Sequence, residues 1–125
     1  MSRTLSGKSD RSPAEFLPLS TADFHILLSI ADGERHGYGI MQDVRQTTGG
    51  TIRLGAGTLY RCIQGLLREN LVEESPRRPA DNEDQRRRYY RLSSLGRRVI
   101  GAEARRLADA VDLAKVKRVL RRAPI

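Results

Sequence analysis

The apolar residues of this chain recur at helical spacing in four segments, separated by polar turns. Each segment has residues at its ends that typically start or stop a helix, such as Ser20, Gly33, Gly49 and Pro124. The helices that this pattern predicts cover residues 20–33, 38–47, 57–70 and 95–122. The third helix has the tightest apolar stripe, formed by Leu59, Ile63, Leu66 and Leu67.

Three short stretches between the helices are rich in β-branched or aromatic residues. They predict strands at residues 51–54, 71–75 and 88–92. Residues 76–85 are polar and contain two prolines, so the last two strands form a hairpin with a long tip. The order of elements predicts a mainly α fold with a small β-hairpin wing, namely a winged helix-turn-helix followed by a long C-terminal helix.

The pattern divides the chain into three parts. Residues 1–18 are rich in Ser, Arg, Gly and Pro and predict a flexible extension. Residues 19–93 form the winged helix, and residues 94–125 form the C-terminal helix. At about 28 residues that helix spans ~42 Å, more than so small a domain can cover. Its apolar side therefore predicts a homodimer, held by Ile100, Leu107, Val111, Leu113 and Leu120.

Charge is distributed unevenly along the chain. The 125 residues include 23 Lys plus Arg and 15 Asp plus Glu, a formal charge of +8. Residues 19–75 have a net charge of −2, whereas residues 76–92 have +3 and residues 93–125 have +6. Within the acidic part, residues 51–68 contain three arginines and no acid. A basic balance favours nucleic acid, an anionic membrane surface or an acidic partner.

The arginine-rich regions fall where a winged helix meets double-stranded DNA. The third helix can enter the major groove, and the hairpin tip can lie along the phosphate backbone. Candidate DNA-binding residues on the helix are Thr58, Tyr60, Arg61, Gln64 and Arg68. Candidates on the wing are Arg77, Arg78, Arg86, Arg87 and Arg88. Tyr60 can alternatively pack against the hairpin, and Thr58 can cap the first turn.

Four motifs resemble those of the PadR family of bacterial transcription regulators. They are His36-Gly37-Tyr38-Gly39-Ile40, Gly57-Thr58-Leu59-Tyr60, Leu66-Leu67-Arg68-Glu69-Asn70-Leu71-Val72 and Arg88-Tyr89-Tyr90-Arg91-Leu92-Ser93-Ser94-Leu95-Gly96. The resemblance covers about residues 18–100. It implies a dimeric repressor of the short type, with one C-terminal dimerisation helix and release by a small-molecule effector. Two-fold symmetry then predicts a pseudo-palindromic operator with half-sites ~34 Å apart, or a multiple of that.

The sequence gives little support for metal binding, catalysis or a reactive cysteine. Two histidines and one cysteine at unrelated spacings do not form a zinc ligand set, so we expect both histidines to be structural. We expect no cofactor, no metal and no enzyme activity, because a Gly-rich phosphate loop and a catalytic triad are missing. We also expect no membrane partner and a cytoplasmic location. Cys62 is expected to be an inert thiol, with a thiol switch as the alternative.

One alternative function stays open. The basic face of a winged helix can meet an acidic protein instead of DNA, and the same residues would then form a protein-interaction module. Sequence-dependent DNA binding separates the two functions.

Overall fold

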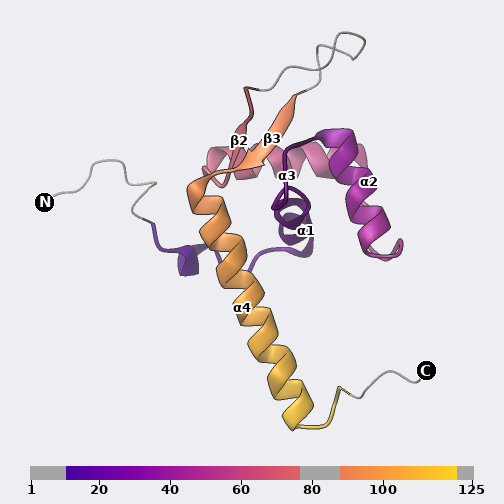
Figure 1. The fold of residues 1–125 in the computed structure, drawn as a ribbon, viewed down its shortest axis with the longest axis vertical. Helices are drawn as coiled ribbons and strands as arrows, with labels where there is room; N and C mark the ends of the chain where they lie inside the picture. Colours follow the sequence, from indigo (N-terminus) through magenta and orange to yellow (C-terminus); the bar gives the residue numbers. More distant parts are fainter. Residues whose placement is uncertain (1–10, 77–87, 121–125) are drawn as a thin grey trace, which may run out of the picture.

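Three helices form the centre of the structure, with a small sheet at one end and a long helix that extends away from it (Figure 1). This computed structural model describes residues 11–76 and 88–120. The helices are η1 (Pro13–Phe16), α1 (Thr21–Ser29), α2 (Gly37–Thr47), α3 (Ala56–Arg68) and α4 (Ser94–Val116). The strands are β1 (Arg35–His36), β2 (Val72–Glu74) and β3 (Tyr89–Leu92). The winged helix-turn-helix that the sequence predicts is confirmed.

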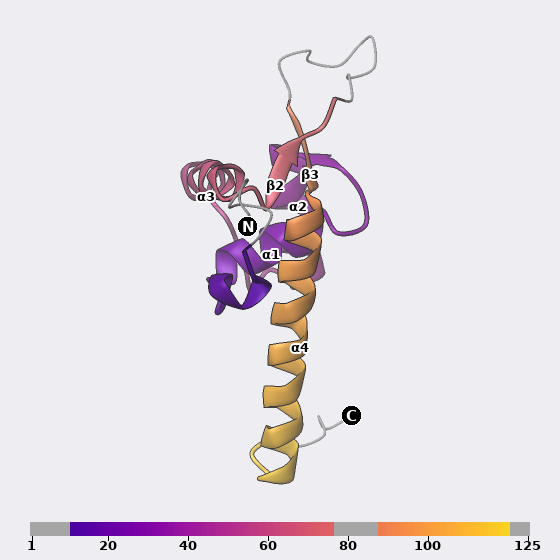
Figure 2. The same ribbon diagram turned by 90° about the vertical axis from the view of Figure 1, so that its left-hand side faces the viewer.

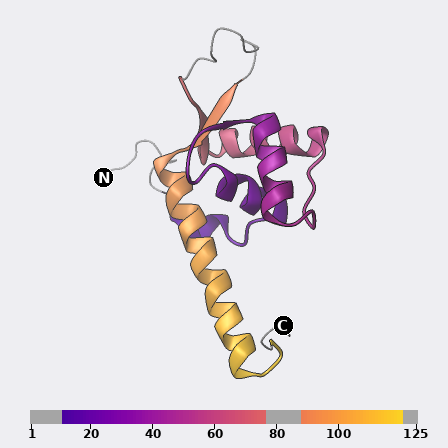
Figure 3. The same cartoon turned by 45° about the vertical axis from the view of Figure 1, so that its right-hand side comes forward.

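The core lies where α1, α2, α3 and the first half of α4 meet. Each helix contributes fully buried aliphatic side chains, such as Ile26 from α1, Ile40 from α2, Ile63 from α3 and Val99 from α4. Figure 3 shows α2 crossing in front of α3, which is the helix-turn-helix pair. Figure 2 shows α3 and α4 on opposite sides of the body. The exposed face of α3 is therefore turned away from α4.

The sheet is antiparallel in the order β1-β3-β2. Arg35 pairs with Tyr90 on one side of β3, and Val72 pairs with Leu92 on the other. The strand predicted at residues 51–54 is wrong, because residues 51 and 52 form a bend and residues 53 and 54 have no regular secondary structure. Thr48 holds the turn by accepting the Ile52 N–H at 3.1 Å. Apolar residues alternate in this segment because the side chains of Ile52 and Leu54 both pack against the core.

Side chains of the residues just before three helices cap their first turns. Ser20 Oγ accepts the Asp23 N–H at 3.0 Å, and Ser93 Oγ accepts the Gly96 N–H at 2.9 Å. His36 Nδ1 accepts the Gly39 N–H at 3.0 Å and so begins α2. This confirms a structural role for His36. The first helix ends at Ser29, a turn earlier than the predicted stop at Gly33.

The long helix ends at Val116, whereas the sequence predicts helix to residue 122. Arg118 takes a left-handed conformation with φ 63°. The Val119 N–H then bonds to the Ala114 carbonyl at 3.0 Å, and the Arg118 N–H bonds to the Lys115 carbonyl at 3.1 Å. These two bonds form the Schellman motif that closes many helices, here without its usual glycine. Leu120 consequently lies beyond the end of the helix.

The flexible extension expected for residues 1–18 is corrected where the structure describes it. Residues 11–18 contain η1, which a capping box at Ser12 begins. Phe16 and Leu17 pack against the core. Burial of these two apolar side chains explains why the segment stays on the domain. Residues 1–10 lie outside the described part of the chain.

A buried carboxylate joins this N-terminal segment to α4. Glu103 is 1% exposed and accepts the Leu19 N–H at 2.9 Å. Arg106 donates to both of its oxygens, at 2.6 and 3.0 Å. The Arg106 hydrogen bonds hold the pKa of the Glu103 carboxyl below its usual range, and the Leu19 N–H adds to this against the effect of burial. The charged form of Glu103 is therefore the one that stabilises the fold.

Replacing Glu103 with Gln should lower the free energy of unfolding at pH 7 by about 1–3 kcal/mol, because a charged acceptor of buried hydrogen bonds is lost. A depressed folded-state pKa contributes stability above the ordinary Glu pKa of ~4.3, and this contribution is lost as the pH falls. Urea unfolding measured from pH 7 to pH 3 should thus show the free energy of unfolding of the wild type approaching that of E103Q in acid. Asp109→Asn, at an exposed position on the same helix, is the control. A gap between wild type and E103Q that is constant with pH would contradict this role.

Candidate nucleic-acid interface

One face of α3 is buried and the opposite face carries the polar side chains. Leu59, Ile63 and Leu66 are buried in the core. The five side chains that the sequence assigns to DNA contact on this helix are all exposed, namely Thr58, Tyr60, Arg61, Gln64 and Arg68. Their exposure follows from helical periodicity once the apolar stripe is buried. Their role as DNA contacts stays a prediction.

The arginines of the winged helix differ in whether they have a carboxylate partner. Arg35 lies near Asp32 and Asp43, Arg88 pairs with Glu74 at 2.7 Å, and Arg91 pairs with Glu73 at 2.9 Å. Four others make no ion pair with any described residue: Arg45, Arg53, Arg61 and Arg68. All four lie in α2, in α3 or in the turn between them. The helix-turn-helix therefore carries positive charge that no acid among the described residues neutralises in an ion pair.

The N-terminus of α3 adds to this positive surface. Gly55 is its N-cap residue and makes no side-chain capping bond, and the first turn contains no acid. Gly55 and Gly57 have open space where a side chain would begin. Backbone N–H groups and the positive end of the helix dipole are thus accessible, which suits a phosphate.

Tyr60 connects the two helices of the helix-turn-helix. Its ring and hydroxyl lie so close to Gly37, the first residue of α2, that a Cβ on Gly37 would collide with them. Tyr60 is still 44% exposed. The His36-Gly37 and Leu59-Tyr60 motifs are therefore in contact, and a side chain at position 37 would force Tyr60 to move. The sequence shows both motifs but not that they touch.

The wing is anchored to the same region. The His36 and Tyr89 rings meet edge to face with centroids 5.3 Å apart. A Cβ on Gly96 would collide with the Leu71 carbonyl, so α4 begins directly against the start of β2. Arg88 is exposed at the base of the wing, where Glu74 neutralises it. The other wing candidates, Arg77, Arg78, Arg86 and Arg87, lie outside the described residues.

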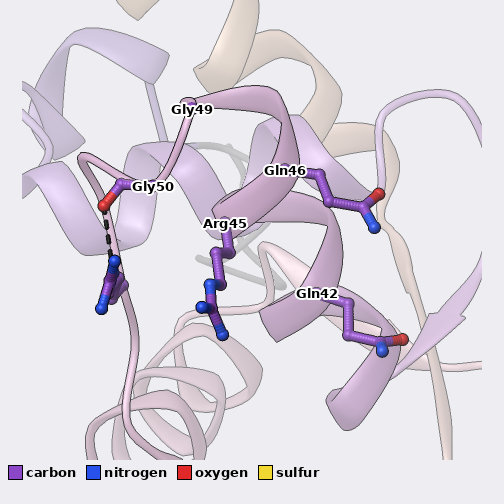
Figure 4. Close-up of a pocket in the computed structure, with 6 residues that line it drawn as sticks. Gln42, Arg45, Gln46, Gly49 and Gly50 are labelled. Carbon is purple, nitrogen blue, oxygen red and sulfur yellow. Dashed lines mark hydrogen bonds between the residues drawn. The ribbon is translucent and has the colours of Figure 1, made fainter.

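A groove beside α3 was not predicted. It has a volume of about 440 Å³ and is lined by Gln42, Arg45, Gln46, Gly49, Gly50 and Arg53. Figure 4 shows Arg45, Gln42 and Gln46 extending from α2, with Gly49 and Gly50 in the turn that follows. The signal in the sequence was the run of residues 51–68 without an acid, which includes Arg53 but says nothing of Arg45.

The residues predicted to hold a dimer fall into two groups. Ile100 is buried in the core of the chain itself. The other four are large apolar side chains exposed on or beyond the second half of α4: Leu107, Val111, Leu113 and Leu120. This half of α4 extends beyond the rest of the domain (Figure 1). It carries an apolar surface that the described residues of the chain do not cover.

Cys62 lies on α3 and faces Asp23 of α1. The thiol is half-buried, and the Asp23 carboxylate lies close enough to influence its titration. Burial raises the pKa of the Cys62 thiol, and the negative charge of Asp23 raises it further, whereas Arg61 opposes them. A reactive cysteine needs a lowered pKa. The surroundings of Cys62 therefore favour the unreactive thiol.

The fold and this surface define a winged-helix DNA-binding protein. The model of the transcriptional regulator PadR-like family matches residues 26–102, and the chain belongs to this family. The members of this family are transcription regulators. In the described residues, no helix combines the length and the apolar character needed to span a bilayer.

The chain is also similar to known proteins in sequence and in fold. An uncharacterized protein of Lysinibacillus sphaericus is 28% identical over 73% of this chain and 82% of its own length. An uncharacterized 37.1 kDa protein in transposon TN4556 of Streptomyces fradiae is 36% identical over 70% of this chain. This chain spans only 23% of that longer relative. The crystal structure of a PadR family transcription regulator from Clostridium difficile R20291 has the same fold, with a TM-score of 0.66 at 20% identity, covering 77% of this chain and 96% of the other.

Replacing Asp23 with Asn should speed alkylation of Cys62 by iodoacetamide. The substitution removes a negative charge that raises the thiol pKa, so more thiolate is present at a given pH. Alkylation rates measured from pH 7 to pH 10 should show the titration of D23N shifted to lower pH than that of the wild type. Asp43→Asn on α2 removes a charge without touching Cys62 and should leave the profile unchanged. Equal profiles for D23N and the wild type would refute the Asp23 contact.

Proposed function

We propose that this protein is a sequence-specific, homodimeric repressor that binds a pseudo-palindromic operator in the cytoplasm. The observation that carries the proposal is the set of four arginines on α2, α3 and their turn that have no carboxylate partner among the described residues. Unpaired guanidinium groups on a helix-turn-helix suit the phosphates and guanine edges of duplex DNA. Each subunit would place one α3 in the major groove.

The exposed face of α3 supports a division of roles. Arg61 and Gln64 lie one turn apart on the exposed face, and both side chains can bond base edges. Arg68 lies one further turn along and suits a phosphate. Thr58 lies in the open first turn, where its hydroxyl and backbone N–H suit another phosphate. Arginines of the wing would contact the backbone outside this region.

The C-terminal half of α4 supports the homodimer. Leu107 and Val111 continue the same helix face as Ile100, which packs on the winged helix. Beyond the domain this face is exposed, and burying it against a second copy would remove apolar surface from water. Release by a small-molecule effector at that interface completes the proposal, on the ground of family membership alone.

An acidic protein partner is the competing function, because it would use the same arginines. DNA binding by base contacts depends on sequence, whereas an acidic surface offers charge without base edges. A titration against DNA therefore decides between the two.

Arg61→Ala and Gln64→Ala should each reduce the preference for the operator over random duplex by about 1–3 kcal/mol, because each removes a base contact. The measurement is fluorescence anisotropy with a fragment upstream of the gene and a scrambled fragment of equal length. Arg87→Ala should instead weaken binding to both fragments alike. A wild type that binds both fragments equally would contradict the repressor function. If Arg61→Ala weakened binding to both fragments alike and Arg87→Ala reduced the preference for the operator, the division of roles would be wrong.

Replacing Leu107 and Val111 together with Asp should convert the dimer to monomers, because two charges would enter its apolar contact. Sedimentation velocity of the full chain measures this directly. Arg105→Asp changes the net charge by the same amount from a position about 160° round the helix from Leu107 and should remain dimeric. Unchanged dimers of the double variant would rule out this interface.

A further inference from the structure

The groove beside α3 is built by a turn that brings two arginines together. Gly49 and Gly50 adopt φ values of 62° and 84°, which side chains other than glycine rarely tolerate. The Gly50 N–H bonds back to the Arg45 carbonyl at 2.8 Å, so the turn closes onto the end of α2. Arg53 Nε in turn donates to the Gly50 carbonyl at 3.2 Å, drawn as the dashed line in Figure 4. This folds Arg53 back towards the groove that Arg45 also lines.

The lining of the groove has the chemistry of an anion site. It holds two guanidinium groups and two primary amides, and no acid. Arg45 has no hydrogen bond or ion pair to any described residue, and Arg53 uses only its Nε. The remaining guanidinium nitrogens are available donors, and a guanidinium binds two phosphate oxygens at once.

The position of the groove points to DNA as the source of the phosphate. Arg53, which lines the groove, comes three residues before Ala56, the first residue of α3, so one side of the groove leads into the start of the helix expected to enter the major groove. When α3 lies in the major groove of a duplex, a phosphate backbone runs along each side of that major groove. The hairpin of β2 and β3 lies at the other end of α3, because β2 follows α3 in the chain.

We propose that Gln42, Arg45, Gln46 and Arg53 grip the DNA backbone beside the start of α3. The inference rests on the proposed function and adds to it a second backbone contact, on the side away from the wing. These side chains are positioning residues that set the register of α3 and read no base. Their contribution is therefore independent of sequence and sensitive to salt.

The test replaces both arginines with glutamine, which keeps polar side chains in the groove and removes its charge. Binding of R45Q/R53Q to the upstream fragment and to the scrambled fragment is measured from 50 to 200 mM KCl. If each of the four arginines in the dimer neutralises one phosphate, the log–log slope becomes less negative by ~3.6. The affinity ratio of wild type to variant then falls about 150-fold across that salt range. The preference for the upstream fragment should not change, and R45Q alone should show about half the change in slope.

The matched control is R105Q/K115Q, which removes two exposed charges from α4 and should keep the wild-type slope. An R45Q/R53Q variant with the slope and affinity of the wild type would overturn the groove contact while leaving the repressor intact. Stabilisation of the DNA-free wild type, and not of R45Q/R53Q, by inorganic phosphate with an unchanged DNA slope would assign the groove to free phosphate and also overturn it. A wild type that binds no duplex would overturn the proposed function and this contact together.

Discussion

Burial of the apolar stripe of α3 against α1 and α2 is the constraint on which the rest of the structure depends. Leu59, Ile63 and Leu66 can be buried in only one rotation of the helix, and that rotation leaves Tyr60, Arg61, Gln64 and Arg68 in solvent. The hydrophobic effect that folds the domain thus also displays its polar surface. A substitution in the stripe would disturb the candidate interface without touching any of its residues.

Ion pairing then decides which charges remain for a partner. The sheet register brings Arg91 opposite Glu73, and Arg88 lies beside Glu74, so the base of the wing is nearly neutral. Among the described residues, the ion pair of Asp43 on α2 with Arg35 on β1 is the only one that involves α2 or α3. It lies at the edge nearest the sheet. Positive potential is therefore concentrated on the outer face of α2 and α3, although residues 19–75 as a whole are slightly acidic.

The sequence predicted correctly the elements in which apolar residues recur at a regular spacing. It failed where a single contact determines the local structure. Helices α2 and α3, the hairpin strands and the exposed face of α3 follow from spacing. Strand β1 has two residues and no period, so only its pairing with β3 defines it. The end of α4 depends on Arg118 in a conformation that usually signals glycine. The groove depends on the closure of a glycine turn, which brings Arg45 and Arg53 together although they are eight positions apart in sequence.

The start of α4 transmits the placement of α3 to the rest of the long helix. Ser93 Oγ donates to the Asn70 carbonyl at 2.6 Å, and Gly96 lets α4 lie directly on the Leu71 backbone. Asn70 and Leu71 come two and three residues after the last residue of α3, so α4 is attached to the end of the helix proposed to read DNA. Glu103 then fixes the next turns through Leu19. In a dimer formed by α4, these contacts would set the distance between the two copies of α3. The half-site spacing of the operator would then depend on the close approach at Gly96 and the hydrogen bond of Ser93 at the start of α4.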